Sequence, residues 1–261
     1  MPRILVRRPS PRLADGELTH LHRRPVDPDL ALRQWEGYVA AFAGRGWAVA
    51  EVEPADEHPD GVFVEDTVVV FDDLAVLTRP GVASREGEVA STARALDGLG
   101  LAVARITAPG TLDGGDVLKV GRTAYVGRGG RTNDAGIAQL DALLAPRGWT
   151  VVPVPVTTVL HLKSAVTALP DGTIVGTAPP ASALTPGLVV EEEHGTAVVD
   201  LGGGAVVMSA DAPRTAALFR SRGLDVLPVA ITEFEKLEGC VTCLSVRVRT
   251  QRAPAAAGGP R

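Results

Sequence analysis

Two cysteines, the only ones in the chain, lie close together near its C-terminal end. Cys240 and Cys243 form a C-x-x-C pattern within EKLEGCVTCLSVRVRT, residues 235–250. Such a pair could be a redox couple, two metal ligands, or one nucleophile beside an uninvolved neighbour. A redox pair normally opens a helix, but the residues after Cys243 alternate between apolar and charged, as in a strand. Zinc would need His161 and His194 as further ligands. We favour one nucleophile and keep a thiol-redox or metal-binding protein as the alternative.

Polar residues also stand at the starts of other predicted strands. They are Asp60, Glu65 and Asp66 in PDGVFVED, Asp113 and Asp116 in LDGGD, and His161 in LHLKS. A thiolate needs a cationic neighbour, and an imidazole moves protons near neutral pH. If these strand starts converge, a thiol, an imidazole and a carboxylate become available for nucleophilic catalysis. The structural alternative for each is ordinary, since such a histidine can be hydrogen-bonded scaffold and such a cysteine a small core residue.

The acidic residues indicate the kind of substrate. Asp60, Glu65 and Asp66 lie within seven positions of one another. Buried carboxylates cost free energy unless a cation or a proton satisfies them. A guanidinium is a planar, permanent cation that binds carboxylates in a bidentate manner. By the same geometry, Arg85 and Arg131 could hold a carboxylate at the opposite end of a substrate.

The elements that must position these residues alternate between two periods of apolar residues. Helical periodicity covers residues 29–44, 84–99, 132–146 and 213–222, with a weaker stretch at 179–187, and each is followed by short strands. Asp29 and Asn133 are expected to cap the first and third helices. The unit of helix, strand, turn and strand recurs about five times. This repeat predicts one closed, radially repeated α/β domain, with an open α/β sheet as the alternative.

Composition bounds the class of protein. The chain has 261 residues, of which 45% are hydrophobic, and a net charge of −5, so a large core is expected and binding to nucleic acid or to an anionic membrane is not. No apolar run is long enough to span a bilayer and no signal peptide is evident, so we expect a cytoplasmic protein. We expect a single catalytic domain over residues 1–250, a mobile lid at 9–28 and a disordered tail at 251–261.

Several consecutive motifs resemble those of a known family. The blocks are PDGVFVED, LTRPG followed by SR, TLDGGDVL, GRTN, LHLKS and TCLSV, in this order from about residue 60 to residue 247. They are similar to the dimethylarginine dimethylaminohydrolases of the pentein, or guanidino-group-modifying, superfamily. The resemblance implies a five-bladed α/β propeller with pseudo-fivefold symmetry, which agrees with the count of repeats.

Carried to the matching positions, the resemblance implies a set of site residues. The catalytic residues would be Cys243 as nucleophile, His161 as general acid and then base, and Asp113, where some relatives carry glutamate, as the carboxylate that orients His161. The substrate-binding residues would be Glu65 and Asp66 for the guanidinium, Asp60 and the backbone of Leu18 for the α-amino group, and Arg85 and Arg131 for the α-carboxylate. The family pattern gives Cys240 no role.

The implied reaction is hydrolysis of Nω-methylated arginines to citrulline and dimethylamine or methylamine through a thiouronium on Cys243. No metal or organic cofactor is needed, and the expected partner is a small methylated arginine. No nucleic acid and no membrane is expected as a partner, and a homodimer is left open. Another pentein hydrolase, acting on free arginine or on citrulline, is the nearest alternative because it would use the same three catalytic groups.

Overall fold

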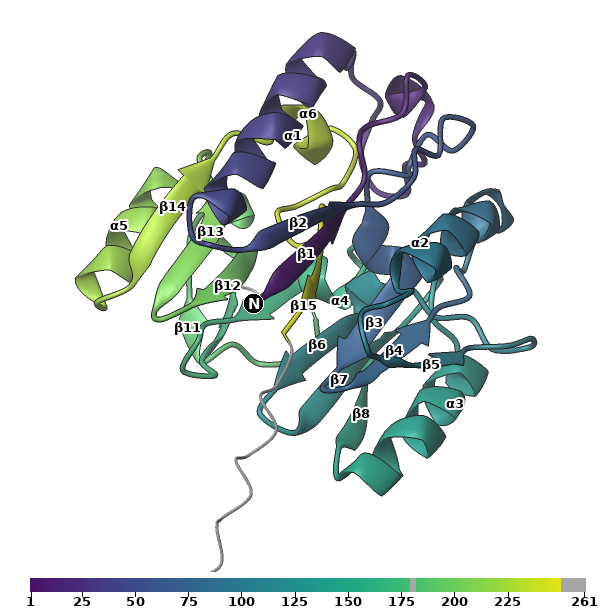
Figure 1. Ribbon diagram of the computed structural model, residues 1–261. Coiled ribbons are helices and arrows are strands. Elements are labelled where there is room, and N and C mark those ends of the chain that lie inside the picture. Colours follow the sequence, from purple (N-terminus) through teal and green to yellow (C-terminus); the bar gives the residue numbers. More distant parts are fainter. Residues whose placement is uncertain (179–181, 250–261) are drawn as a thin grey trace, which may run out of the picture.

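The strands of the protein form five sheets of three strands each in a computed structural model that describes residues 1–178 and 182–249 (Figure 1). In every sheet the middle strand pairs antiparallel with one neighbour and parallel with the other. The sheets are β3 (Val68–Phe71), β4 (Leu74–Leu77) and β5 (Ala102–Arg105); β6 (Val117–Val120), β7 (Thr123–Arg128) and β8 (Thr150–Pro155); β9 (Val166–Ala168), β10 (Ile174–Gly176) and β11 (Leu188–Val189); β12 (Val198–Gly202), β13 (Ala205–Ser209) and β14 (Asp225–Val229); and β15 (Val246–Val248), β1 (Arg3–Val6) and β2 (Ala48–Glu51).

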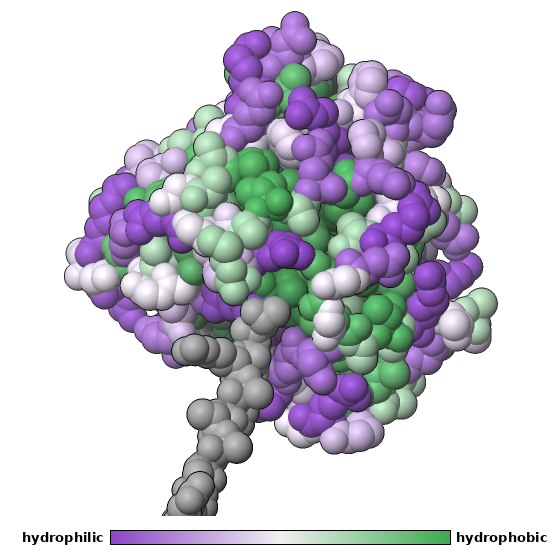
Figure 2. Space-filling view, viewed as in Figure 1, coloured by the Kyte–Doolittle hydropathy of each residue, from purple (hydrophilic) through white to green (hydrophobic). Residues whose placement is uncertain are grey.

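The longer helices lie on the outside of the molecule, with the strands toward its middle (Figure 1). The helices are α1 (Pro28–Ala43), α2 (Val89–Ala95), α3 (Asp134–Leu144), α4 (Leu162–Ala165), α5 (Pro213–Ser221) and α6 (Thr232–Glu235). Hydrophilic residues are most frequent around the rim of the face seen in Figure 2, and hydrophobic residues gather nearer its middle. The mixed sheets and outer helices confirm the predicted α/β class.

The helix boundaries agree with the sequence in part. The side chain of Asn133 accepts the Gly136 amide and caps α3, as predicted. The predicted cap Asp29 is wrong, because Asp27 accepts the Leu30 amide and caps α1 instead. Asp27 precedes a proline at the first helical position, which keeps it extended and suits it to the cap.

Two predicted helices are shorter than expected or absent. In the stretch 84–99 only α2 is α-helical, because a 3-10 turn, η3 (Ala83–Glu88), precedes it and buries Arg85 and Glu88. Of the stretch 179–187, residues 179–181 lie outside the described part of the chain, and residues 182–187 carry no helix. A Pro-Gly pair at positions 186 and 187 explains that loss. The predicted tail at 251–261 also lies outside the described residues.

The two ends of the chain meet in one sheet. Strand β1 pairs antiparallel with β15 and parallel with β2. Ile4 and Val6 face one hydrophobic cluster, with α1, while Leu5 faces a second cluster, with β3 and β4. Strand β1 is therefore buried on both faces. No helix among the described residues is long and apolar enough to cross a membrane.

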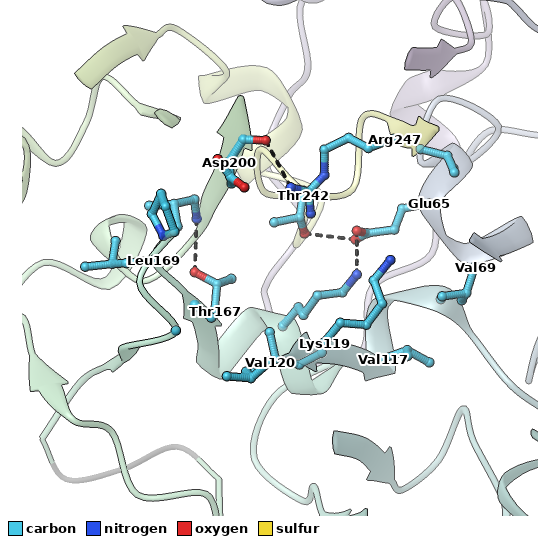
Figure 3. Close-up of a pocket in the computed structure, with 18 of the residues that line it drawn as sticks. Glu65, Val69, Val117, Lys119, Val120, Thr167, Leu169, Asp200, Thr242 and Arg247 are labelled. Carbon is cyan, nitrogen blue, oxygen red and sulfur yellow. Dashed lines mark hydrogen bonds and ion pairs between the residues drawn. The ribbon is translucent and has the colours of Figure 1, made fainter. Parts of the chain in front are cut away.

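In every sheet, the edge strand that pairs antiparallel with the middle strand borders one cavity. Residues of β3, β6, β9, β12 and β15 line a space of about 360 Å³, which we call the central cavity (Figure 3). The segments that precede β3, β6 and β15 carry the polar motifs singled out in the sequence. The arrangement of the sheets thus brings residues from distant parts of the chain to one place.

Candidate active site

His161 and Asp113 are in direct contact and almost fully buried. The Nε2 atom of His161 lies 3.0 Å from Oδ2 of Asp113. The other oxygen of Asp113 accepts the Gly81 amide at 2.8 Å, and the Arg131 guanidinium lies 3.8 Å from Oδ2. Asp113 is thus held by several partners, and its carboxylate fixes the orientation of the imidazole.

Two glycines explain why the chain can bring these groups so close. A side chain on Gly114 would come within 2.0 Å of the Glu65 carbonyl oxygen, and one on Gly115 within 2.6 Å of Nδ1 of His161. The amide of Gly115 also donates to Oδ1 of Asp66 at 2.8 Å. The backbone of the DGGD motif therefore packs against both the histidine and the acidic segment, and only glycine leaves room for this.

Asp66 lies between a histidine and an arginine. Its Oδ1 is 3.9 Å from Nδ1 of His161, and its Oδ2 is 2.6 Å from the Arg85 guanidinium. Burial by itself raises the pKa of Asp66, but the charges of His161 and Arg85 outweigh burial and hold that pKa well below its usual range. Asp66 is therefore ionised at neutral pH.

Asp66 and Asp113 together raise the pKa of His161. Burial by itself lowers the pKa of His161, but the charge of Asp66 and the hydrogen bond with Asp113 raise it to about 9. The imidazole is therefore protonated at neutral pH and can donate a proton to a leaving group.

Asp116 holds the backbone beside His161 in place. It received no catalytic or binding role in the sequence analysis. Its Oδ1 accepts the amide of Leu162, the residue after His161, at 2.9 Å, and its Oδ2 accepts the Thr132 hydroxyl at 2.6 Å. Burial raises the pKa of Asp116 to about 6. The only signal for Asp116 in the sequence was its place in the DGGD motif, whose two aspartates both contact the segment of His161 and Leu162.

The two cysteines touch each other in the turn before β15. The Sγ atoms of Cys240 and Cys243 are 3.4 Å apart, and the Cys240 amide points to the Cys243 sulfur at 3.4 Å. Their mutual hydrogen bond lowers the pKa of Cys240 to about 7 and raises that of Cys243 well above its ordinary value. The pair therefore titrates as a unit, and its first thiolate lies on Cys240, hydrogen-bonded to the Cys243 thiol.

One small cavity brings most of the predicted residues together. It has a volume of about 20 Å³ and is lined by Glu17, Asp60, Phe63, Asp66, Arg85, Arg131, Leu160, His161, Leu237, Glu238, Gly239 and Cys243. A space of this size holds about one water molecule. The site is therefore too narrow for an amino acid in this structure, and Glu17 of the segment 9–28 is among the residues that line it.

The residues expected to bind the ends of a substrate are engaged with the protein itself. Asp60 accepts the Glu17 amide at 3.0 Å, and burial raises the pKa of Asp60. Arg131 lies 3.3 Å from the Thr19 hydroxyl. Arg85 is bonded to Asp66, to Glu88 and to backbone carbonyls. Leu18 is partly buried and packs against the hydrophobic cluster beside α1.

The side chain of Glu65 also faces away from the small cavity. Its carboxylate is bonded to Lys163 at 2.5 Å and to the Thr242 hydroxyl at 2.8 Å, and it borders the central cavity (Figure 3). Asp66, which follows Glu65 in the chain, and Cys243, which follows Thr242, line the small cavity instead. Successive residues thus point to opposite sides of one partition.

A metal would compete with contacts that are already made. Ligand atoms of Asp66, Asp113 and His161 lie within 4.8 Å of one another. His161 and Asp113 are bonded to each other, and the Arg85 guanidinium already supplies Asp66 with a positive partner. This arrangement fits an acid–base site better than a metal centre.

Comparison with known proteins identifies relatives over nearly the full length. No family model matches the chain. It is 58% identical to the N(G),N(G)-dimethylarginine dimethylaminohydrolase of Streptomyces coelicolor over 95% of this chain and 97% of that protein. It is 33% identical to the enzyme of the same name from Pseudomonas aeruginosa, over 94% and 98%.

Solved structures agree with these relatives. A cysteine-to-serine variant of the Pseudomonas aeruginosa enzyme, complexed with citrulline, superimposes with a TM-score of 0.85 at 30% identity, over 94% of this chain and 98% of that one. The N-terminal domain of ArgZ, an arginine dihydrolase, gives a TM-score of 0.84 at 21% identity over 95% and 98%, which is a likeness of fold.

The fold and the site define a hydrolase of the pentein superfamily. Within it, the chain belongs to the dimethylarginine dimethylaminohydrolase family. The resemblance found in the sequence motifs is thereby confirmed.

Proposed function

We propose that this protein hydrolyses Nω,Nω-dimethylarginine and Nω-monomethylarginine to citrulline and dimethylamine or methylamine. The observation that carries the proposal is the convergence of Cys243, His161 and Asp66 on one small cavity, in a chain 58% identical to a relative of this name. A nucleophile, a protonated acid and a carboxylate for the guanidinium are the groups that this reaction needs.

In the proposed architecture, each three-stranded sheet is one blade of a five-bladed propeller, and the central cavity lies on its axis. The antiparallel edge strand of each sheet borders that cavity, which supports this arrangement. Residues 1–250 form one catalytic domain. All the proposed site residues come from one chain.

The reaction would proceed in two steps. The Cys243 thiolate attacks the guanidinium carbon, and the proton of the His161 imidazolium passes to the departing methylated amine as its C–N bond breaks. A thiouronium on Cys243 and a neutral His161 remain. The imidazole then takes a proton from water, whose oxygen attacks the thiouronium carbon. The C–S bond breaks, the hydroxyl proton of the adduct passes to solvent, and neutral citrulline and the Cys243 thiolate are released.

Binding would require the site to open. The small cavity of about 20 Å³ admits no amino acid, so the segment 9–28 would act as a lid. The substrate guanidinium would take the Asp66 oxygen now bonded to Arg85. The freed side of Arg85, together with Arg131, would hold the α-carboxylate, and Asp60 with the backbone of Leu18 would hold the α-amino group. A contact of Glu65 with the guanidinium would require Glu65 to leave Lys163.

Purified protein tests the proposal directly. With dimethylarginine as substrate we expect citrulline release, lost by at least about 10³-fold in Cys243→Ser because a hydroxyl is a far weaker nucleophile. Cys240→Ser should keep most of the activity and serves as the matched control. Faster turnover of free arginine than of dimethylarginine would replace this function with that of a deiminase.

A further inference from the structure

The central cavity contains charged groups that the proposed reaction does not use. Lys119 of β6 and Arg247 of β15 extend into it from different sheets, and both also border an adjoining cavity of about 330 Å³ (Figure 3). Glu65 and Thr242 separate this space from the small cavity that contains Cys243. The cations therefore lie apart from the catalytic residues.

The other charged groups around these cavities already have partners of opposite charge. Glu65 is paired with Lys163, Asp200 with Arg249, and Asp72 with Arg122, whereas Asp171 at the rim is exposed and lies near Arg222. The Lys119 ammonium instead donates to the Val70 carbonyl at 2.7 Å and lies over the Phe71 ring. Arg247 donates to the Asp200 carbonyl at 3.1 Å. In the described part of the chain, neither forms an ion pair within 4.0 Å.

Such an arrangement leaves two partly buried cations without an ion pair of their own. Burial lowers the pKa of Lys119 to about 7, and the neighbouring cations Arg247, Lys163 and Arg249 lower that pKa by more than Glu65 raises it. Burial and Arg249 likewise lower the pKa of Arg247 by more than Asp200 and Glu65 raise it. A partly buried cation without an ion pair is unfavourable, and an anion that enters between the two would relieve that cost.

We propose that the central cavity binds a compact phosphate-class oxyanion between Lys119 and Arg247. An ammonium and a guanidinium together match a doubly charged oxyanion, because the guanidinium offers a fork of donors and the ammonium a point charge. A cationic methylarginine is repelled there, so this site is distinct from the proposed substrate site. The inference stands whether or not the proposed reaction is right.

Titration calorimetry with inorganic phosphate at pH 8, where most of the phosphate is already doubly charged, tests the inference. An anion beside Lys119 raises the pKa of the ammonium from about 7 back toward its ordinary value, so binding should take up most of a proton. Repeating the titration in two buffers of different ionisation enthalpy measures that uptake. Glycerol 3-phosphate, in a parallel titration, distinguishes a site for free phosphate from one that accepts phosphate monoesters.

Lys119→Met should weaken phosphate binding at least about tenfold and remove the proton uptake. Arg33→Met removes one positive charge from the exposed face of α1 and should bind phosphate as the wild type does. Equal binding by wild type and Lys119→Met would overturn the inference, as would the absence of binding to the wild type.

Thermal unfolding gives a second readout that does not depend on one variant folding well. Phosphate should raise the Tm of the wild type, since it binds only the folded state. Lys119→Glu places a carboxylate beside Arg247, so it should raise the Tm without phosphate and abolish the response to phosphate. A response retained in Lys119→Glu would place the anion elsewhere, for example at Arg85 and Arg131, and would contradict the inference.

Discussion

The imidazole of His161 lies between two carboxylates, and this decides the pH range in which the site can work. The charge of Asp66 and the hydrogen bond with Asp113 outweigh burial and raise the pKa of His161 to about 9. The cysteine pair loses its first proton from Cys240, whose pKa is about 7, and the Cys243 thiol, whose pKa is raised, can pass its proton to that thiolate across 3.4 Å. Between these values the site holds both a thiolate and an imidazolium, which are the two forms that the proposed reaction needs.

We therefore expect kcat/KM to follow a bell with limbs near pH 7 and pH 9. The acid limb reports the thiol pair of the free enzyme, and the alkaline limb reports loss of the His161 proton. Rates of citrulline formation across pH measure both limbs. Asp66→Asn removes one negative neighbour and should move the alkaline limb to lower pH. An unmoved alkaline limb in that variant would show that Asp66 does not hold the proton on His161.

Cys240 contributes a hydrogen bond that the sequence did not suggest. Cys240→Ala removes it, so the acid limb should move from about 7 toward the ordinary cysteine value of about 8.5. The rate on the plateau should change little, because Cys240 does not line the small cavity. Cys240→Ser, which retains a donor, is the control and should shift the limb less. An acid limb unchanged in Cys240→Ala would mean that the nucleophile ionises without help from Cys240.

At the scale of single residues, motif order indicated most of what the structure brings together. Asp113, His161 and Cys243 were found because each stands beside a predicted strand start in a motif that resembles one of the family. The direction of Glu65 could not be found in this way. Glu65 and Asp66 are adjacent in the chain, yet Glu65 faces the central cavity and Asp66 the small cavity. The contacts of Glu65 with Lys163 and Thr242 set its direction, and they cannot be predicted from the motif.

Among the elements, the segment 9–28 has three successive backbone amides bonded to one glutamate. The Glu238 carboxylate accepts the backbone amides of Thr19, His20 and Leu21. Glu238 has a φ of 61°, a left-handed conformation that is unfavourable for this residue type. Its place between α6 and Cys240 therefore joins the proposed lid to the segment that carries the nucleophile.

Glu238→Gln should loosen the lid while keeping the size of the side chain. A neutral amide is a weaker acceptor than a carboxylate, so we expect KM for dimethylarginine to rise about three- to tenfold. The midpoint of thermal unfolding should change little, since the contacts are at the surface. Glu36→Gln, on the exposed face of α1, should leave KM unchanged. A fall in Tm without a change in KM would assign Glu238 a structural role only.

The sequence predicted elements better than their ends. The alternation of helical and strand periods gave the five repeats and most of the strands. It failed where a side chain had to be buried inside a turn, as for Arg85 in η3, and where Pro186 and Gly187 interrupt a helical pattern. Neither effect changes the period of apolar residues, so periodicity alone could not reveal them.

At the scale of the whole molecule, the pairing of β1 with β15 joins the two ends of the chain in one sheet. Ile4 of β1 is fully buried and stands opposite Arg247 on one side and Val49 on the other. Arg247 also borders the central cavity. The same sheet therefore supports the hydrophobic cluster beside α1 and one wall of that cavity, so its loss should affect the entire fold.

Ile4→Ala should lower the free energy of unfolding by about 2–5 kcal/mol, because it removes apolar atoms from a site that packing on both sides prevents from collapsing. Urea denaturation measures the change. Val49→Ala is the matched control, since Val49 lies in the same row of the sheet but is 39% exposed, and it should cost less than about 1 kcal/mol. If the two variants lost equal stability, β1 would be acting through strand propensity and not through burial. If Ile4→Ala lost less than the control, the ends of the chain would contribute little to holding the five sheets together.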